Sequence, residues 1–174
     1  MQPALIVICA VLGAIAYGIV HDQITARICL EYFTIGHPPV FDTTSPTLLA
    51  LGWGIIATWW VGLPLGVGLA IAARSGPNPK RSARSLIRPI GLLLVVMGVC
   101  ALVAGIIGAV LAQRGTILLW EPLNSAVPRS KHVRFLADAW AHTASYIAGV
   151  AGGCVLIIWT WHARKVATGQ AGST

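Results

Sequence analysis

Four long apolar stretches divide this 174-residue chain, at about residues 3–20, 48–73, 89–112 and 135–161. A helix needs about 20 apolar residues to cross the roughly 30 Å hydrocarbon core of a bilayer, and each stretch is close to that length or longer. Only a helix pairs all of its backbone groups within one such segment. We therefore predict an all-α fold, an integral membrane four-helix bundle in which residues 1–174 form a single membrane domain.

Composition excludes a water-soluble alternative. Hydrophobic residues make up 56% of the chain and charged residues 10%, and the mean hydropathy is +0.79. A soluble protein of this size needs more polar surface than these residues supply. The net charge of +7 does not indicate nucleic-acid binding, because no soluble domain remains to present a basic groove.

Basic residues predict how the helices are oriented. Five Lys/Arg residues lie between the second and third stretches and two follow the fourth, with no carboxylate among them: Arg74, Lys80, Arg81, Arg84, Arg88, Arg164 and Lys165. Cytoplasmic loops carry this excess, so we expect a multi-pass protein of the inner (plasma) membrane with cytoplasmic N- and C-termini and outer loops at 22–47 and 113–134. The basic loop is expected to contact anionic lipid, at about 1 kcal/mol for each charge.

Groups that bind metals or move protons gather on one predicted face. All five carboxylates and four of the five histidines fall in the two outer loops or at the helix ends beside them: Asp22, Glu31, Asp42, Glu121, Asp138, His21, His37, His132 and His142. The sequence therefore predicts a functional site on the non-cytoplasmic side. It contains no complete motif of a familiar enzyme, so the reaction and the substrate stay open.

Helical spacing brings part of this set together. Asp138, His142 and Tyr146 are four residues apart and share one face of the fourth helix, as Tyr17 and His21 do on the first. At a rise of 1.5 Å per residue, both histidines reach about 27–28 Å above the inner boundary and lie level. We expect the first and fourth spans to be antiparallel neighbours whose histidines face each other.

Two imidazoles with carboxylates suit zinc or non-haem iron. The first outer loop can add ligands if it folds back over the bundle. The six candidate ligands are His21, Asp22, Glu31, His37, Asp138 and His142. The residues fit a metal-binding protein, which can be a metal-dependent enzyme.

Three other interpretations fit the same residues. The cluster can be an interfacial hydrogen-bond network in which the negative charge of Asp138 interacts favourably with the dipole at the start of the fourth helix. The outer face can belong to a non-catalytic accessory or assembly protein that docks a protein partner or forms a homo-oligomer. His21 and His142 can also hold a haem for electron transfer.

Two stretches carry a resemblance to other proteins. They are HDQITARICLEYFTIGHPP at residues 21–39 and FLADAWAHTASY at 135–146. With these stretches the chain resembles a set of small bacterial four-span membrane proteins without an assigned activity. The resemblance covers most of the chain and implies only the architecture.

Overall fold

The structure, a computed structural model, describes the backbone of residues 1–171 and the side chains of residues 1–166. These residues are mostly helical and contain no β-strand, as the sequence predicts. The elements are α1 (Gln2–Ile28), α2 (Leu30–Thr34), α3 (Pro46–Ile56), α4 (Trp59–Arg74), α5 (Ala83–Gln113), α6 (Leu123–Ala126), a short 3-10 turn (Arg129–Lys131) and α7 (His132–Ala171).

Four segments are long and apolar enough to cross a membrane, which confirms the predicted number of spans. They are Gln2–Ile28, Pro46–Arg74, Ala83–Gln113 and Arg129–Val166. Each extends beyond the predicted apolar stretch. At the site end, α1 continues through the first part of the expected outer loop to Ile28 before the short α2 follows.

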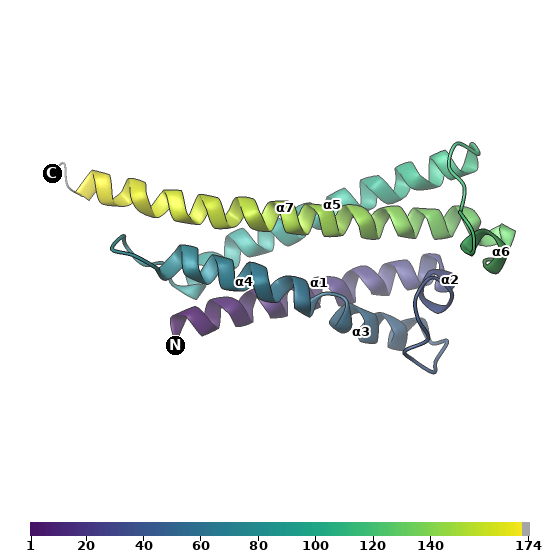
Figure 1. Ribbon diagram of the computed structural model, residues 1–174, viewed down its shortest axis with the longest axis horizontal. Coiled ribbons are helices and arrows are strands. Elements are labelled where there is room, and N and C mark those ends of the chain that lie inside the picture. The colour runs from purple at the N-terminus through teal and green to yellow at the C-terminus, as the bar shows by residue number, and fades with distance from the viewer. Residues whose placement is uncertain (172–174) are drawn as a thin grey trace.

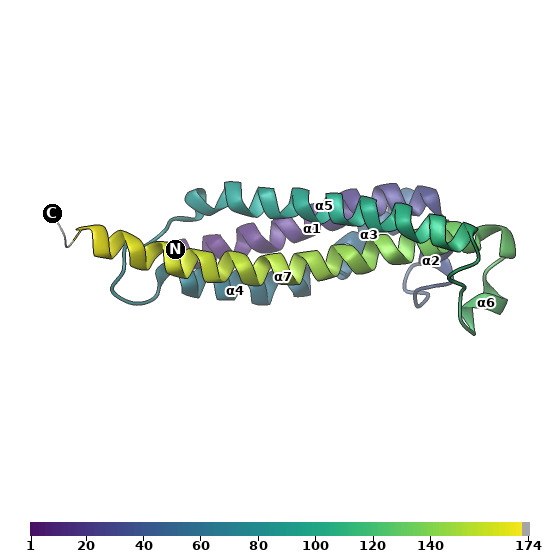
Figure 2. The ribbon, with the colours of Figure 1, turned by 90° about the horizontal axis from the view of Figure 1, so that it is seen from above.

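The helices form an elongated bundle (Figures 1 and 2). α1 begins and α7 ends at one end of the bundle, while α2 and α6 lie at the other. α1 packs along α3, α4 and α5, and α7 packs mainly along α5 and α4. α1 and α7 are thus diagonal across the bundle rather than neighbours, a difference from the sequence prediction. Their side chains nevertheless meet at the centre.

Glycines set how closely α1 meets the second span. A Cβ on Gly62 would lie 2.9 Å from the Cβ of Ala14, and one on Gly66 would lie 2.9 Å from the Cβ of Ala10. Nearer the α2 end, a Cβ on Gly18 would lie 2.6 Å from the carbonyl oxygen of Gly54. Small residues allow this close approach of backbones, which supplies packing energy in lipid. The contact fixes α1 just before its two candidate ligands.

The second span is interrupted between α3 and α4, at residues 57 and 58. Pro64, inside α4, has no backbone N–H to donate to the carbonyl of Trp60, which loosens that turn. The observed break lies slightly earlier. The Thr58 hydroxyl donates to the carbonyl of Gly54, and the Tyr146 hydroxyl of α7 donates to the carbonyl of Ala57 at 3.0 Å. Side chains therefore satisfy carbonyls where the regular helix stops.

Candidate metal site

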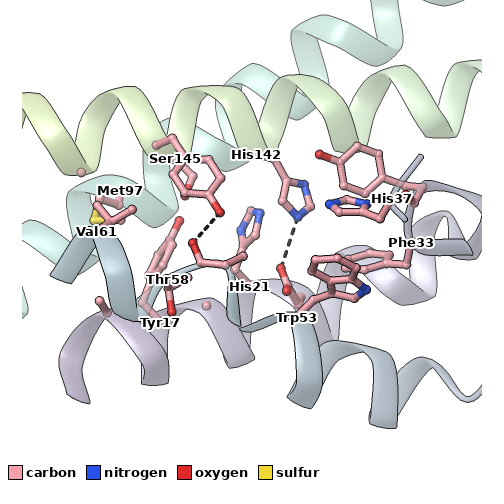
Figure 3. A pocket seen from close by; sticks show the side chains of 17 residues that line it. Tyr17, His21, Phe33, His37, Trp53, Thr58, Val61, Met97, His142 and Ser145 are labelled. Carbon is pink, nitrogen blue, oxygen red and sulfur yellow. Dashed lines mark hydrogen bonds and ion pairs between the residues drawn. The ribbon is translucent and has the colours of Figure 1, made fainter. Parts of the chain in front are cut away.

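A cavity of about 80 Å³ lies inside the bundle, toward the end that carries α2. Every long helix contributes to its wall, together with α2 and the loop that follows it (Figure 3). Its polar lining includes Tyr17, His21, Asp22, Tyr32, His37, Thr58, His142, Ser145 and Tyr146. A water needs about 10–15 Å³ of such space, so the cavity has room for an ion with waters or for a small group.

His21, Asp22 and His142 form a group that can hold a metal ion. One potential ligand atom from each residue lies within 4.8 Å of the other two. Asp22 and His142 are buried, at 5% and 9% exposure, and His21 is half-buried. Since His21 and Asp22 belong to α1 and His142 to α7, the diagonal arrangement brings the three residues to the bundle centre.

The hydrogen bonds of His142 determine which ring nitrogen carries a proton and which one faces Asp22. Its Nδ1 lies 2.8 Å from the carbonyl oxygen of Asp138, which can only accept, so Nδ1 carries a proton and donates. Its Nε2 lies 3.2 Å from Oδ1 of Asp22. A neutral imidazole has one N–H, so this second contact would bring a lone pair against a carboxylate. A proton or a cation must lie between these two atoms to make the contact favourable.

His21 adds a second ring at the same place. Its ring centroid lies 4.4 Å from that of His142, and the two rings meet edge to face. Tyr17, one turn earlier on α1, stacks beneath His21 at 5.6 Å. The Nε2 atom of His21 is buried and has no hydrogen-bond partner among the described residues. A buried polar atom of this kind is costly unless something binds it.

His37 reaches the same cavity from the loop after α2. Its Nδ1 lies 2.8 Å from the carbonyl oxygen of Tyr32 and therefore donates, leaving Nε2 as the acceptor. Its ring packs on Trp53 at a centroid distance of 4.5 Å. Burial lowers the pKa of His37 below its usual value, despite the opposing hydrogen bond to Tyr32, so the neutral ring is favoured. His37 lines the cavity but lies outside the group of three.

Glu31 and Asp138, the other candidate ligands, also lie outside this group. Glu31 pairs with Lys131 at 2.9 Å and accepts a hydrogen bond from the Cys29 thiol. Burial alone raises the pKa of Glu31, but its bonds, chiefly that to Lys131, bring it below the usual value. Burial raises the pKa of Cys29 to about 11. Asp138 contributes its carbonyl to His142, while its side chain lies in the wall of a different cavity.

Aromatic side chains that the sequence does not assign to the site hold the histidines in place. The ring of Tyr32 stacks on His142 with centroids 4.5 Å apart, and Phe33 lies 5.8 Å from the same ring. Trp53 of α3 is buried and packs against His37. In the sequence, Tyr32 continues a helical spacing of apolar residues with Ile24 and Ile28, but this spacing does not reveal that α2 folds over the bundle.

Comparison of the chain with known protein families, with curated proteins and with solved structures finds no match. The chemistry of the residues around the cavity is therefore the basis for inferring function.

Proposed function

We propose that this protein is a membrane metalloprotein that binds one divalent transition-metal ion through His21, Asp22 and His142. The observation that carries the proposal is the contact between Nε2 of His142 and Oδ1 of Asp22, 3.2 Å apart, while Nδ1 of the same ring is already used by a carbonyl. A cation bonded to both atoms, and to His21, converts an unfavourable contact into coordination. Histidine ligands usually donate their other N–H to a carbonyl or carboxylate in this way.

Zinc and non-haem iron suit these ligands best, because both bind imidazole nitrogen and carboxylate oxygen. Three protein ligands are typical of catalytic zinc sites, which keep a position open for water or substrate, whereas structural sites use four. We therefore extend the proposal to a metal-dependent enzyme in which water bound to the ion is activated inside the cavity. In this proposal His37, which lines the same cavity, would accept a proton or add a fourth ligand through its free Nε2.

The geometry favours a single ion over a haem. In a bis-histidine haem, metal–nitrogen bonds of about 2.0–2.1 Å on opposite faces place the imidazole centroids more than about 6 Å apart. The rings of His21 and His142 are closer, at 4.4 Å, and meet edge to face. Haem binding would require α1 and α7 to separate.

Elemental analysis of protein purified without chelator tests the proposal. We expect close to one zinc or iron per chain, no Soret band in the visible spectrum, and loss of most of this metal in His142→Ala. His162→Ala is the matched control, because His162 is an exposed histidine at the other end of α7, and it should retain the metal. Equal metal in both variants would move the site elsewhere. Metal-free wild-type protein would favour the accessory or assembly role.

A further inference from the structure

A second cavity lies beside the candidate metal site, between α1, α5 and the first turns of α7. This groove has a volume of about 380 Å³ and is lined mostly by small or aliphatic residues, among them Ala101, Gly105 and Ala141. Val20 and Leu102 border it and are 62% and 65% exposed. Because both belong to membrane-spanning helices, the groove opens on a face that lipid covers.

A buried carboxylate lies in the wall of this groove. Asp138 is 1% exposed, and its Oδ2 atom has no hydrogen-bond partner among the described residues. An ionisable side chain that is buried within a bundle of membrane helices is costly and marks a functional site by default. His21 lines the groove as well as the central cavity. The groove therefore ends at polar groups that adjoin the candidate metal site.

We infer that the groove binds the hydrocarbon chain of a neutral membrane lipid whose hydroxyl group lies at Asp138 and His21. The aliphatic walls match a hydrocarbon chain, and the volume falls within the range of about 300–1,000 Å³ typical of ligand sites. Among the described residues that line the groove, none is lysine or arginine. An anionic phosphate head beside Asp138 would lack a counter-charge, whereas a hydroxyl both donates and accepts hydrogen bonds.

The chemistry of the groove thus selects a long-chain alcohol or a diacylglycerol rather than a phospholipid or a fatty acid. Binding in the groove depends on Asp138, on His21 and on the groove walls, and it does not require the metal ion. The role of this lipid as the substrate of the metal site rests on the proposed function, because His21 is the residue that the two cavities share.

Photolabelling of the purified protein in phosphatidylcholine nanodiscs tests the inference. The probe is a diazirine-bearing hexadecanol, and its control is the diazirine-bearing palmitic acid of the same chain length. We expect the alcohol to label α1 and α5 residues of the groove about tenfold more than the acid does, a difference that corresponds to about one hydrogen bond. Equal labelling by the two probes would overturn the inference.

Two glycines of α5 supply matched variants. A Cβ on Gly98 would meet only the ring of Tyr17, at 4.0 Å, so Gly98→Leu fills the groove without displacing a helix. A Cβ on Gly91 meets nothing within 4 Å, and Gly91 does not line the groove. Gly98→Leu should reduce alcohol labelling about tenfold or more, and Gly91→Leu should leave it unchanged. Wild-type labelling in Gly98→Leu would overturn the inference.

Metal content of the same samples separates this inference from the proposed function. His142→Ala should lose the metal and keep the alcohol label, because His142 does not line the groove. Wild-type protein with metal but no groove label would overturn the lipid inference alone. A groove label on wild-type protein that lacks metal would overturn the metal proposal and leave lipid binding in place.

Discussion

The two ends of the bundle bury charged side chains in opposite ways. At the end where α7 stops, Arg164 is 2% exposed and donates to four backbone carbonyls. These acceptors are the carbonyl oxygens of Ala72, Ser75, Asn78 and Pro79. At the other end, Oδ1 of Asp22 and Nε2 of His142 are buried 3.2 Å apart, and Nε2 of His21 has no partner among the described residues.

This difference separates a structural role from a binding role. The last carbonyls of a helix have no intrahelical partners, and Arg164 supplies donors to those at the end of α4 and in the loop that follows. Its hydrogen-bonding capacity is used within the protein. The group formed by His21, Asp22 and His142 keeps capacity unused, which lowers stability unless a ligand binds. Burial of charge alone would not have distinguished the two ends.

Substitution of Arg164 should have the largest effect on stability. A hydrogen bond to a charged group typically contributes about 1.5–3 kcal/mol, and Arg164→Ala removes several such bonds and leaves carbonyls without donors. We expect a loss of this size in the free energy of unfolding measured in detergent. Arg164→Lys, which restores part of the donor set, should lose less.

Lys165→Ala is the matched control for Arg164, because Lys165 is the next residue on α7 and is exposed. It should change the free energy of unfolding by under about 0.5 kcal/mol, as surface substitutions usually do. The folded fraction of Arg164→Lys should keep the metal content of the wild type. An Arg164→Ala protein as stable as the control would contradict the structural role.

The second prediction concerns which end faces the cytoplasm. The basic residues predict that the Arg164 end lies inside and the histidine end outside. The native Cys29 is a poor reporter, because it is 1% exposed and its pKa is raised. Cysteines introduced at the exposed Ser75 and Ser125, which lie at opposite ends of the bundle, are better.

In intact cells, a membrane-impermeant thiol reagent should label Ser125→Cys strongly and leave Ser75→Cys unlabelled. After the cells are opened, both should react. Labelling of Ser75→Cys in intact cells would invert the topology and place the candidate metal site on the cytoplasmic side.

Asp22→Asn tests whether the histidine end of the bundle is a binding site, because a binding site and a structural ion pair predict opposite signs for the change in the free energy of unfolding. The asparagine side chain has the same shape but can donate an N–H to Nε2 of His142, so both groups are satisfied without an ion. In the presence of chelator we expect the variant to gain roughly 0.5–1.5 kcal/mol in free energy of unfolding, the net value of a typical hydrogen bond. Its metal content should fall far below that of the wild type.

The contrast with a structural ion pair makes this test decisive. If Asp22 and His142 served as a permanent ion pair, as Arg164 serves at the other end, Asp22→Asn would be less stable than the wild type with or without chelator. That result would favour the accessory role over a metal site.

The sequence was sufficient for the spans and for part of the site. Apolar length alone predicts four helices, and the four-residue spacing of Asp138 and His142 correctly places them on one face of α7. The rise per residue also brings His21 level with His142. These features depend on one helix or on a common boundary, so a single chain carries the information.

The packing between helices could not be predicted from the sequence in the same way. The diagonal placement of α1 and α7 depends on which faces fit together, including the close contact at Gly18 and Gly54. The loop after α2 brings His37 and Tyr32 onto the site but leaves Glu31 with Lys131. The sequence identifies Arg164 only as a basic residue at the inner boundary. It does not predict the hydrogen bonds of this side chain, because a sequence does not show which carbonyls lack donors.

The smallest effect concerns His37, whose folded-state pKa lies below its usual value of 6.5 because of burial. The folded protein then binds fewer protons at this residue than the unfolded chain does. The stabilisation from the neutral ring is fully present above the ordinary pKa and is lost as the pH falls below about 6.5, with a slope of at most about 1.4 kcal/mol per pH unit for one proton.

His37→Asn removes the titration and keeps an N–H that can donate to the carbonyl of Tyr32. With chelator present, the melting temperature of the wild type should therefore fall more between pH 7.5 and pH 5 than that of His37→Asn, in addition to any constant difference caused by the lost packing of the ring on Trp53. The other titrating groups are common to both proteins, so the difference reports His37 alone. Parallel pH profiles would show that the ring of His37 is not held neutral against the cavity, and would remove it as the proposed proton acceptor or fourth ligand.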